Sequence, residues 1–455
     1  MTRYSDFTVQ DALALHRRDG VFGRRRTSLS RVATASGIDC LWAAAILFLN
    51  GWIYALPVSG PIPIWFTPIQ VTRGVFVHEV ILIGYAGWAL LARQGRVALP
   101  RGRAASISAL IATVGLLAMI SAVWNVRPVK DVISAGRYFL LAAYFVAAIS
   151  WMRKHGFTFV LRTFLLGELI AAVINLYYTA VYSDTYLGGL PMLLGHSGPG
   201  GYLGMSVILS AWLMLERKST FDAVVSVATC IVAVAAVSIS FSKLSMIMAA
   251  LGIVAWIFVL CQDFNTRRAR RWYVAIALLV TTIIGMHWST TLHYIEGVRT
   301  YIDYKFRYID RMSIVTRSQY FLITGEILVA HPLFGAGMGG FYDAEIKTDA
   351  YYSDRAVSEN RELGREGQSH PESSFLYYTA GIGFPGFCVV MLLFVSCVTV
   401  MKHRLETRRF AGKATWVTLV LAYLVFGLTL PTLFNSTILY LPAAIAVAIP
   451  RTPGR

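Results

Sequence analysis

The chain has 455 residues, of which 56% are hydrophobic and only 14% are charged. Soluble domains average about 25% charged residues, and several apolar runs here reach the ~20 residues that a membrane-spanning helix needs. This composition excludes an ordinary soluble protein and predicts an all-α polytopic membrane protein. The net charge of +17 does not indicate nucleic-acid binding, because the basic residues lie mostly in short loops between apolar runs.

The chain divides into four predicted parts. Residues 1–31 form a basic tail without a cleavable signal peptide, and residues 32–289 hold nine predicted spans. A polar segment follows at residues 290–372, and residues 373–455 hold three more spans and a short tail. The twelve predicted spans are residues 32–56, 74–91, 105–124, 132–151, 157–182, a run ending at 216, 223–239, 244–260, 272–288, 374–401, 415–430 and 433–449.

The basic loops set the predicted orientation. Arginine and lysine follow alternate spans, which places both termini in the cytoplasm and segment 290–372 outside the membrane on the opposite side. Loops of this length are usually functional or disordered. This one carries tyrosines, arginines, a glycine turn and a histidine near its end, so we expect the active site there. The five cysteines show no metal-ligand spacing and no disulfide framework, and we expect them to be core residues.

Four ionisable residues fall at one predicted depth, just below the outer surface: His78, Glu79, Arg137 and Lys243. Ionisable residues within spans are costly and therefore suggest function. Together they favour an anion site at the depth of a lipid headgroup. The alternative for each is snorkelling or a structural ion pair, such as Glu79 with Arg137. Glu168, in the middle of its span, has no evident partner.

The first half of the polar segment is basic and aromatic. Arg307 and Arg311 are four residues apart and share a face if the segment is helical, and Arg317 follows. Residues 318–330 are mostly apolar and predict a short helix on the membrane surface, which His331-Pro332 ends.

A glycine-rich turn comes next, with Gly335, Gly337, Gly339 and Gly340, whose backbone N–H groups are suited to bind phosphate. The second half of the segment is acidic. We interpret it as a solvated face, because its spacing matches no metal-ligand pattern. Its acidic residues are Asp343, Glu345, Asp349, Asp354, Glu359, Glu362 and Glu366.

Several of these motifs resemble the O-antigen ligase and O-antigen polymerase family. Arg317-Ser-Gln-Tyr-Phe321 followed by His331-Pro-Leu-Phe-Gly-Ala-Gly337 is similar to the family signature. In that signature an Arg opens a helix, an aromatic residue follows four residues later, and a His-Pro-Leu element ends the helix. The resemblance covers residues 190–390. Its other elements are the glycine-rich stretch around His196, Ser240-Phe-Ser-Lys243, and His370 with Ser374 to Gly386.

The resemblance implies a metal-independent glycosyltransferase without a cofactor, with a GT-C-like architecture, in the bacterial inner membrane and with its active loop in the periplasm. The donor would be a glycan on undecaprenyl diphosphate, and the acceptor a sugar hydroxyl of a second lipid-linked repeat or of lipid A-core. Such a reaction needs cations for the leaving diphosphate and a group that takes the acceptor's proton. The expected diphosphate ligands are Lys243, Arg317, Arg137, Arg311 and Arg307. The expected substrate contacts are His331, Gly335, Gly337, His196 and Glu79.

Two departures from the family pattern leave alternatives open. Lys243 stands where the family has an Arg, which keeps the charge but loses the two-pronged grip on phosphate. The family His lies four residues before the Leu that corresponds to Leu376, and that position is Glu372 here. His370 lies six residues before it. We favour His370 as the base, with Glu372 as the second choice; the alternative is that His370 only caps the following span.

Polymerase and ligase use the same donor and differ in the acceptor. We favour a polymerase of a surface polysaccharide, because the acidic half of the segment would repel a phosphorylated lipid A-core. A non-catalytic export or transport protein is the alternative from another class. It would place polar residues through the full depth of the membrane, whereas here they gather near one face.

Overall fold

The computed structural model describes part of the chain in detail. The described residues are 37–49, 70–72, 75–92, 101–182, 197–240, 243–263, 310–352, 371, 373–406, 409–429, 433–435 and 437–448. They are helical apart from a short antiparallel hairpin of β1 (Gln70–Thr72) and β2 (Val75–Phe76). The hairpin departs from the all-α prediction; β-branched and aromatic residues such as Val71, Val75 and Phe76 favour strands.

The helices follow the predicted spans closely. After the helix Gly37–Leu49 come the long helices and three short helical elements. They are α3 (Val77–Ala92), α4 (Arg103–Trp124), α5 (Val129–His155), α6 (Phe157–Tyr182), α7 (Ser197–Glu216), α8 (Thr220–Ser240), α9 (Lys243–Asp263), α12 (Asp310–Ala330), α13 (Phe341–Glu345), α14 (Asp349–Tyr352), α16 (Ser374–Leu405), α17 (Arg409–Thr429), the 3-10 helix η5 (Leu433–Asn435) and α18 (Thr437–Ala448).

Six of the described helices are long and apolar enough to cross a membrane, and four further apolar helices are shorter. This confirms a helical, multi-pass membrane protein. The count of twelve spans and the sidedness of the loops stay predictions, and predicted span 272–288 lies outside the described residues.

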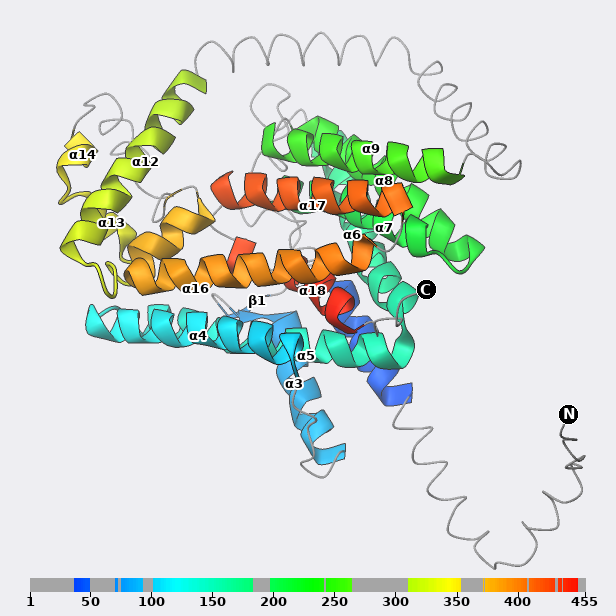
Figure 1. Ribbon diagram of the computed structural model, residues 1–455, viewed down its shortest axis with the longest axis horizontal. Coiled ribbons are helices and arrows are strands. Elements are labelled where there is room, and N and C mark those ends of the chain that lie inside the picture. Colours follow the sequence, from blue (N-terminus) through cyan, green and yellow to red (C-terminus); the bar gives the residue numbers. More distant parts are fainter. Residues whose placement is uncertain are drawn as a thin grey trace, which may run out of the picture.

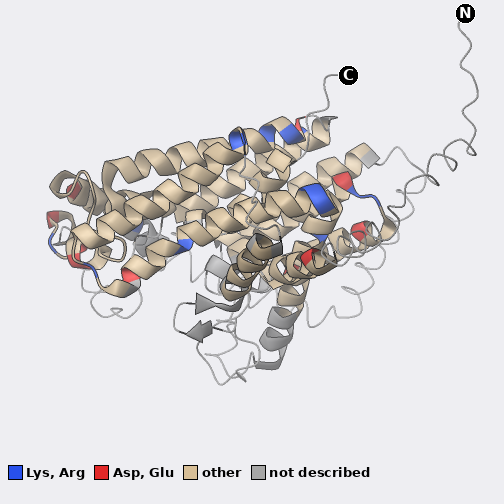
Figure 2. Ribbon diagram, turned by 90° about the horizontal axis from the view of Figure 1, so that it is seen from below, with Lys and Arg blue, Asp and Glu red and all other residues tan. Residues whose placement is uncertain are grey.

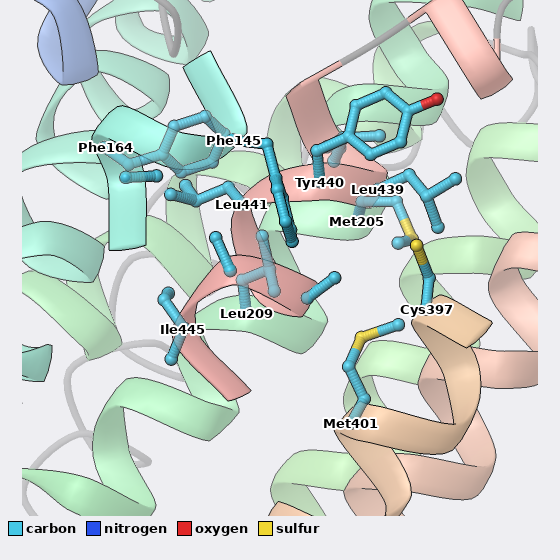
Figure 3. Close-up of a cluster of buried hydrophobic side chains, with 14 of the residues drawn as sticks. Phe145, Phe164, Met205, Leu209, Cys397, Met401, Leu439, Tyr440, Leu441 and Ile445 are labelled. Carbon is cyan, nitrogen blue, oxygen red and sulfur yellow. The ribbon is translucent and has the colours of Figure 1, made fainter. Parts of the chain in front are cut away.

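Side chains pack the bundle around a nearly fully buried α18. Phe145 and Phe164 contribute from α5 and α6, Leu209 from α7, and Cys397 from α16 (Figure 3). Glycines bring some helices close together: a Cβ on Gly252 of α9 would lie 2.6 Å from Val207 of α7. Close helix approach of this kind is typical of membrane bundles, in which small residues favour packing.

The unit formed by α12, α13 and α14 lies at one end of the bundle, beside the turn between α4 and α5 (Figure 1). Charged residues gather mostly toward the two ends of the long helices (Figure 2). At the end opposite α12, ion pairs join neighbouring helices: Lys154 with Asp39, Arg162 with Asp222, and Arg404 with Glu216. The predicted basic loops after α5 and α7 therefore share one end, away from the α12–α14 unit.

Candidate functional site

The segment between α12 and α13 is a turn, as its glycines predict. α12 ends at Ala330, directly before His331-Pro332, which confirms the predicted helix end. Gly335, Gly337 and Gly339 all have positive φ, between 60° and 86°. Glycine adopts this conformation without the steric cost that a side chain would bring.

α16 is interrupted where this turn meets it. Gly383 has φ 75° and ψ −168°, and Pro385 follows inside the helix. A proline lacks an N–H, and a non-helical residue breaks the ladder of backbone hydrogen bonds, so neighbouring polar groups need other partners. The turn supplies them. The N–H of Ala336 donates to the carbonyl of Ala380 (2.7 Å), and the N–H of Phe384 donates to the carbonyl of Pro332 (2.9 Å).

Residues 331–340 dock on the kink of α16, and we call this segment the clasp. The two backbones approach each other very closely: a Cβ on Gly335 would lie 2.3 Å from the carbonyl oxygen of Ala380. The N–H of Gly335 itself donates to the carbonyl of His331, and the N–H of Gly340 donates to the carbonyl of Gly337. These two amides are therefore engaged within the turn. The geometry gives Gly335 a packing role, and its predicted contact with substrate stays a prediction.

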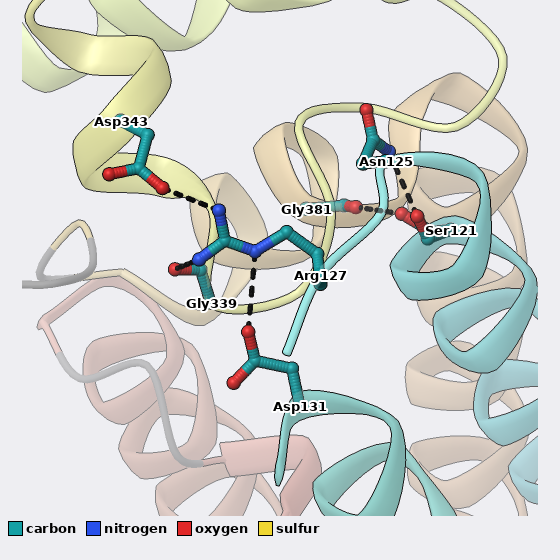
Figure 4. Close-up of polar contacts among 7 residues, drawn as sticks. All are labelled: Ser121, Asn125, Arg127, Asp131, Gly339, Asp343 and Gly381. Carbon is teal, nitrogen blue, oxygen red and sulfur yellow. Dashed lines mark hydrogen bonds and ion pairs between the residues drawn. The ribbon is translucent and has the colours of Figure 1, made fainter. Parts of the chain in front are cut away.

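The C-terminal end of α4 holds the clasp from the other side. Ser121 has a single hydroxyl hydrogen, and its Oγ lies 2.5 Å from the carbonyl of Phe334 and 2.6 Å from that of Gly381. Asn125 donates from Nδ2 to the carbonyl of Gly335 (3.2 Å). Helix α4, the turn and α16 thus meet through backbone carbonyls that two polar side chains bridge (Figure 4).

Arg127, in the turn between α4 and α5, ties the clasp to α13 (Figure 4). Its Nη2 donates to the carbonyl of Gly339 (2.9 Å), its Nε contacts Asp131 (3.3 Å), and its Nη1 pairs with Asp343. Only 17% of the Arg127 side chain is exposed. Burial acts to lower the pKa of the guanidinium, but the hydrogen bonds and charges of Asp343 and Asp131 outweigh it and raise that pKa above its usual value.

The α12–α14 unit has a small core of its own. Tyr320, Ile323 and Ile327 of α12 pack with Phe341 of α13 and with Tyr351 of α14. The carboxylate of Glu326 accepts the N–H groups of Asp349 and Ala350 at the start of α14 (2.7 and 3.0 Å). This unit is therefore a folded platform beside the clasp. Its acidic residues are not all solvated as predicted, since Glu345 is buried.

The two predicted bases, His370 and Glu372, lie outside the described residues. They directly precede α16, whose N-cap is Ser373: its Oγ accepts the N–H of Leu376 and donates to the carbonyl of Gly427. Ser374 accepts the N–H of Leu433 (3.0 Å). The start of α16 is thus fixed to the region of α17 and η5, and Ser373 occupies its N-cap position.

The predicted cations are only partly described. Arg137 lies on α5 next to Tyr138. The hydroxyl of Tyr138 contacts the hydroxyl of Tyr378, which lies one turn into α16. Arg137 is therefore close to the level at which α16 begins. Arg317 is half-buried on α12, well inside the helix rather than at its beginning. The backbones of Lys243 and Arg311 are helical but their side chains are not described, and Arg307 lies outside the described residues.

The remaining predicted contacts lie elsewhere. Glu79 belongs to α3, and its side chain is not described; His196 precedes α7, outside the described residues. His331 is exposed just after the end of α12. Sequence reasoning missed Ser121, Asn125 and Arg127, because their partners in the clasp, α16 and α13 lie more than two hundred residues away. The only local signal was the four-residue spacing of Arg127 and Asp131.

Comparison with known proteins adds one finding. Residues 228–391 match the family model described as O-antigen ligase. The matched region is about a third of the chain and runs from α8 into α16, so it contains the clasp and the α12–α14 unit. No curated protein matches the chain.

Proposed function

We propose that this chain, whose residues 228–391 match the family model described as O-antigen ligase, transfers a glycan from undecaprenyl diphosphate to an acceptor sugar hydroxyl. The acceptor oxygen forms a bond to the anomeric carbon of the donor glycan, and the bond from that carbon to the diphosphate breaks. The hydroxyl proton passes to a base of the protein, and undecaprenyl diphosphate leaves. The reaction takes place at the outer face of the bacterial inner membrane, without a metal.

One observation carries the proposal: the His331-Pro-Leu element of the signature docks on the kink of α16, the same helix that the two predicted bases directly precede in the sequence. The clasp and Arg127 join α4 and α5 to the α12–α14 unit and to the first half of α16. Positioning of this kind supports catalysis, because reacting groups must be held to within a fraction of an ångström.

The leaving diphosphate needs cations that stabilise its charge. We assign this role to Arg317, Arg137 and Lys243, with Arg311 and Arg307 as helpers. The depth of Arg137, at the level of the first turns of α16, supports its place in this group. Glycan contacts are assigned to the motif residues His331, Gly335, Gly337 and His196, and to Glu79, which is predicted to lie at the same depth as Arg137 and Lys243.

For the base we favour His370, whose neutral imidazole is suited to accept a proton near pH 7. Glu372 is the second choice. Ser373 already fills the N-cap position of α16, which leaves no need for His370 as a cap. Both residues are separated from the start of α16 by at most three chain positions.

Polymerase and ligase remain the two candidate reactions, and we place polymerase first because the acidic half of segment 290–372 disfavours a phosphorylated core. Specific observations favour the ligase as the second candidate. Asp343 is paired with Arg127 and Glu345 is buried. Both carboxylates therefore add little to the negative charge that would repel a phosphorylated acceptor. The matched family is also described as O-antigen ligase.

The experiment uses the purified full chain in liposomes with a lipid-linked repeat as the only glycan. A ladder of longer chains supports the polymerase. Transfer that begins only when lipid A-core is added assigns the ligase instead. If neither product forms, while a cell extract with the same substrates is active, the chain is an export or transport protein and the proposal fails.

Site variants test the assigned roles in the same assay. Arg317→Ala should nearly abolish transfer, because charge-assisted contacts to phosphate are about twice as strong as neutral ones. Lys347→Ala, an exposed cation on the same unit, is the matched control and should be active. His370→Ala and Glu372→Gln are compared in parallel: full activity of the first with loss in the second makes Glu372 the base.

Sidedness has its own test. A cysteine at exposed Asp349 should react with a membrane-impermeant maleimide added from the periplasmic side of spheroplasts. Reaction only after the cytoplasmic side is opened would reverse the proposed orientation.

A further inference from the structure

Helix α12 has a second face that the protein core does not use. Phe321, Leu322 and Val329 are all exposed on it, and the exposed fraction of Val329 reaches 84%. Positions 322, 325 and 329 recur at helical spacing, so these residues form one stripe along the helix. The buried residues Tyr320, Ile323 and Ile327 lie on the opposite side and form the core of the α12–α14 unit.

The exposed stripe carries no charge. Between Ser318 and Ala330 the only side chain that is charged at neutral pH is Glu326, and its carboxylate accepts the N–H groups at the start of α14. A helix face in water normally carries charged or polar residues, and contiguous exposed apolar surface marks a binding or membrane-contact surface.

This stripe is continuous with the surface of a candidate span. The hydrogen bond from Phe384 to the carbonyl of Pro332 places exposed Leu333, the end of the stripe, beside α16. From there the exposed apolar residues of α16 continue along the bundle through Phe384, Leu392 and Val395. Because α16 is long and apolar enough to cross a membrane, this exposed apolar side is the surface that lipid would contact.

We infer that α12 is an interfacial helix, with Phe321, Leu322, Val329 and Leu333 immersed among the acyl chains at the headgroup boundary. The partner of this surface is bilayer lipid, argued from its lack of charge and from its continuity with the lipid-facing side of α16. An amphipathic helix binds a membrane in this way, with its apolar face buried ~5–10 Å below the headgroups.

The inference gives α12 a physical task. Anchored in the interface, the helix fixes the height of the whole α12–α14 unit and of the clasp above the membrane. Arg317, about one helical turn before the first stripe residue Phe321, is then held near the level of lipid phosphates. The inference depends on the membrane assignment alone, so it stands or fails independently of the proposed glycan transfer.

The test uses the unmodified chain in liposomes of phosphatidylcholine that carries a diazirine in its acyl chain. Irradiation generates a carbene, and mass spectrometry of peptides locates the inserted lipid. Label on Phe321, Leu322 and Val329 should be comparable to that on Leu392 and Val395 of α16, which serve as positive controls. Lys347 and Asp349, exposed on the other side of the unit, should show only background.

A water-soluble carbene reagent in the same liposomes gives the complementary measurement. The inference predicts that Leu322 and Val329 are protected from it while Lys347 reacts. Reaction of the stripe with the aqueous reagent, without lipid label, would show that it faces water. Protection from both reagents would show that protein covers it, either a second copy or another part of the chain. Each of these two results overturns the inference.

Discussion

Arg127 and Asp343 form an ion pair across 216 positions of the sequence, and this contact joins the turn between α4 and α5 to α13. The same guanidinium donates to the carbonyl of Gly339 and contacts Asp131. One side chain therefore holds the membrane bundle, the clasp and the α12–α14 unit in a single arrangement.

The first prediction concerns this guanidinium. Asp343 is 61% exposed, so Asp343→Asn should cost no more than about 1 kcal/mol of stability. Arg127→Ala also leaves the Gly339 carbonyl and Asp131 without their donor and should cost more, about 1–3 kcal/mol. Glycan transfer should fall with Arg127→Ala and be partly kept by Arg127→Lys, which retains the charge but not three divergent donors.

Thermal unfolding in detergent and the liposome transfer assay measure both effects. Arg103→Ala is the control, because Arg103 is an exposed arginine at the far end of α4. Equal losses for Arg103→Ala and Arg127→Ala would contradict the prediction, since they would show that any arginine near this helix matters alike.

The second prediction concerns the clasp. Gly335→Ala adds a Cβ that would lie 2.3 Å from the carbonyl oxygen of Ala380, at a residue whose φ is +60°. We expect loss of transfer and a destabilisation of more than about 1 kcal/mol, because Ala is strained at positive φ even without the clash.

Gly325→Ala is the matched control, since nothing lies within 4 Å of its Cβ position in the middle of α12. It should be neutral or raise stability by about 0.5–1 kcal/mol, the usual helix preference for Ala over Gly. Limited proteolysis between α12 and α13 reports on the clasp directly. Unchanged protection in Gly335→Ala would mean that the docked turn is not needed to hold this unit.

The third prediction concerns the strained end of α4. Val126 has φ +50°, an unusual conformation for a β-branched residue, and the N–H of Arg127 donates back to the carbonyl of Ala122 (2.8 Å). This is the position at which helices prefer glycine. Val126→Gly should therefore raise the free energy of unfolding by up to about 1 kcal/mol.

Val126→Ala keeps a Cβ and should bring much less gain, which separates backbone strain from the loss of an apolar side chain. Chemical unfolding of both variants in the same detergent makes the comparison. If both variants are less stable than the wild type, the exposed valine side chain contributes more than the backbone strain costs, and a Val126→Gly protein less stable than Val126→Ala contradicts the prediction.

The fourth prediction concerns Glu168, which is 2% exposed in the middle of α6. Its Oε1 has no hydrogen-bond partner among the described residues. A buried polar group without a partner costs about 1–3 kcal/mol, so Glu168→Met, of similar volume, should be more stable than the wild type by an amount of this order.

Unfolding measurements of Glu168→Met and Glu168→Gln decide this point, because Gln keeps a polar group and should gain little. Transfer activity is measured in parallel. A stable Glu168→Met protein without activity would contradict a passive role and bring the residue into the mechanism.

The sequence by itself determined the membrane class and the position of most helices. α6 spans Phe157–Tyr182 as predicted, and α12 ends directly before His331-Pro332. Such features depend on local properties: the length of an apolar run, and the restriction that proline places on the residue before it. The family signature was visible for the same reason, since its residues are contiguous in the chain.

Only the tertiary structure showed how the residues of the signature pack. Its glycines were interpreted as a phosphate-binding turn, but Gly335 packs against Ala380 and its N–H is used within the turn. Asp343, interpreted as part of a solvated acidic face, pairs with Arg127. Ser121 reaches the carbonyl of Gly381 across 260 positions. Contacts between residues so far apart leave no periodic or local pattern in the sequence. The contact of Ser121 depends on where the kink of α16 directs its freed carbonyl groups.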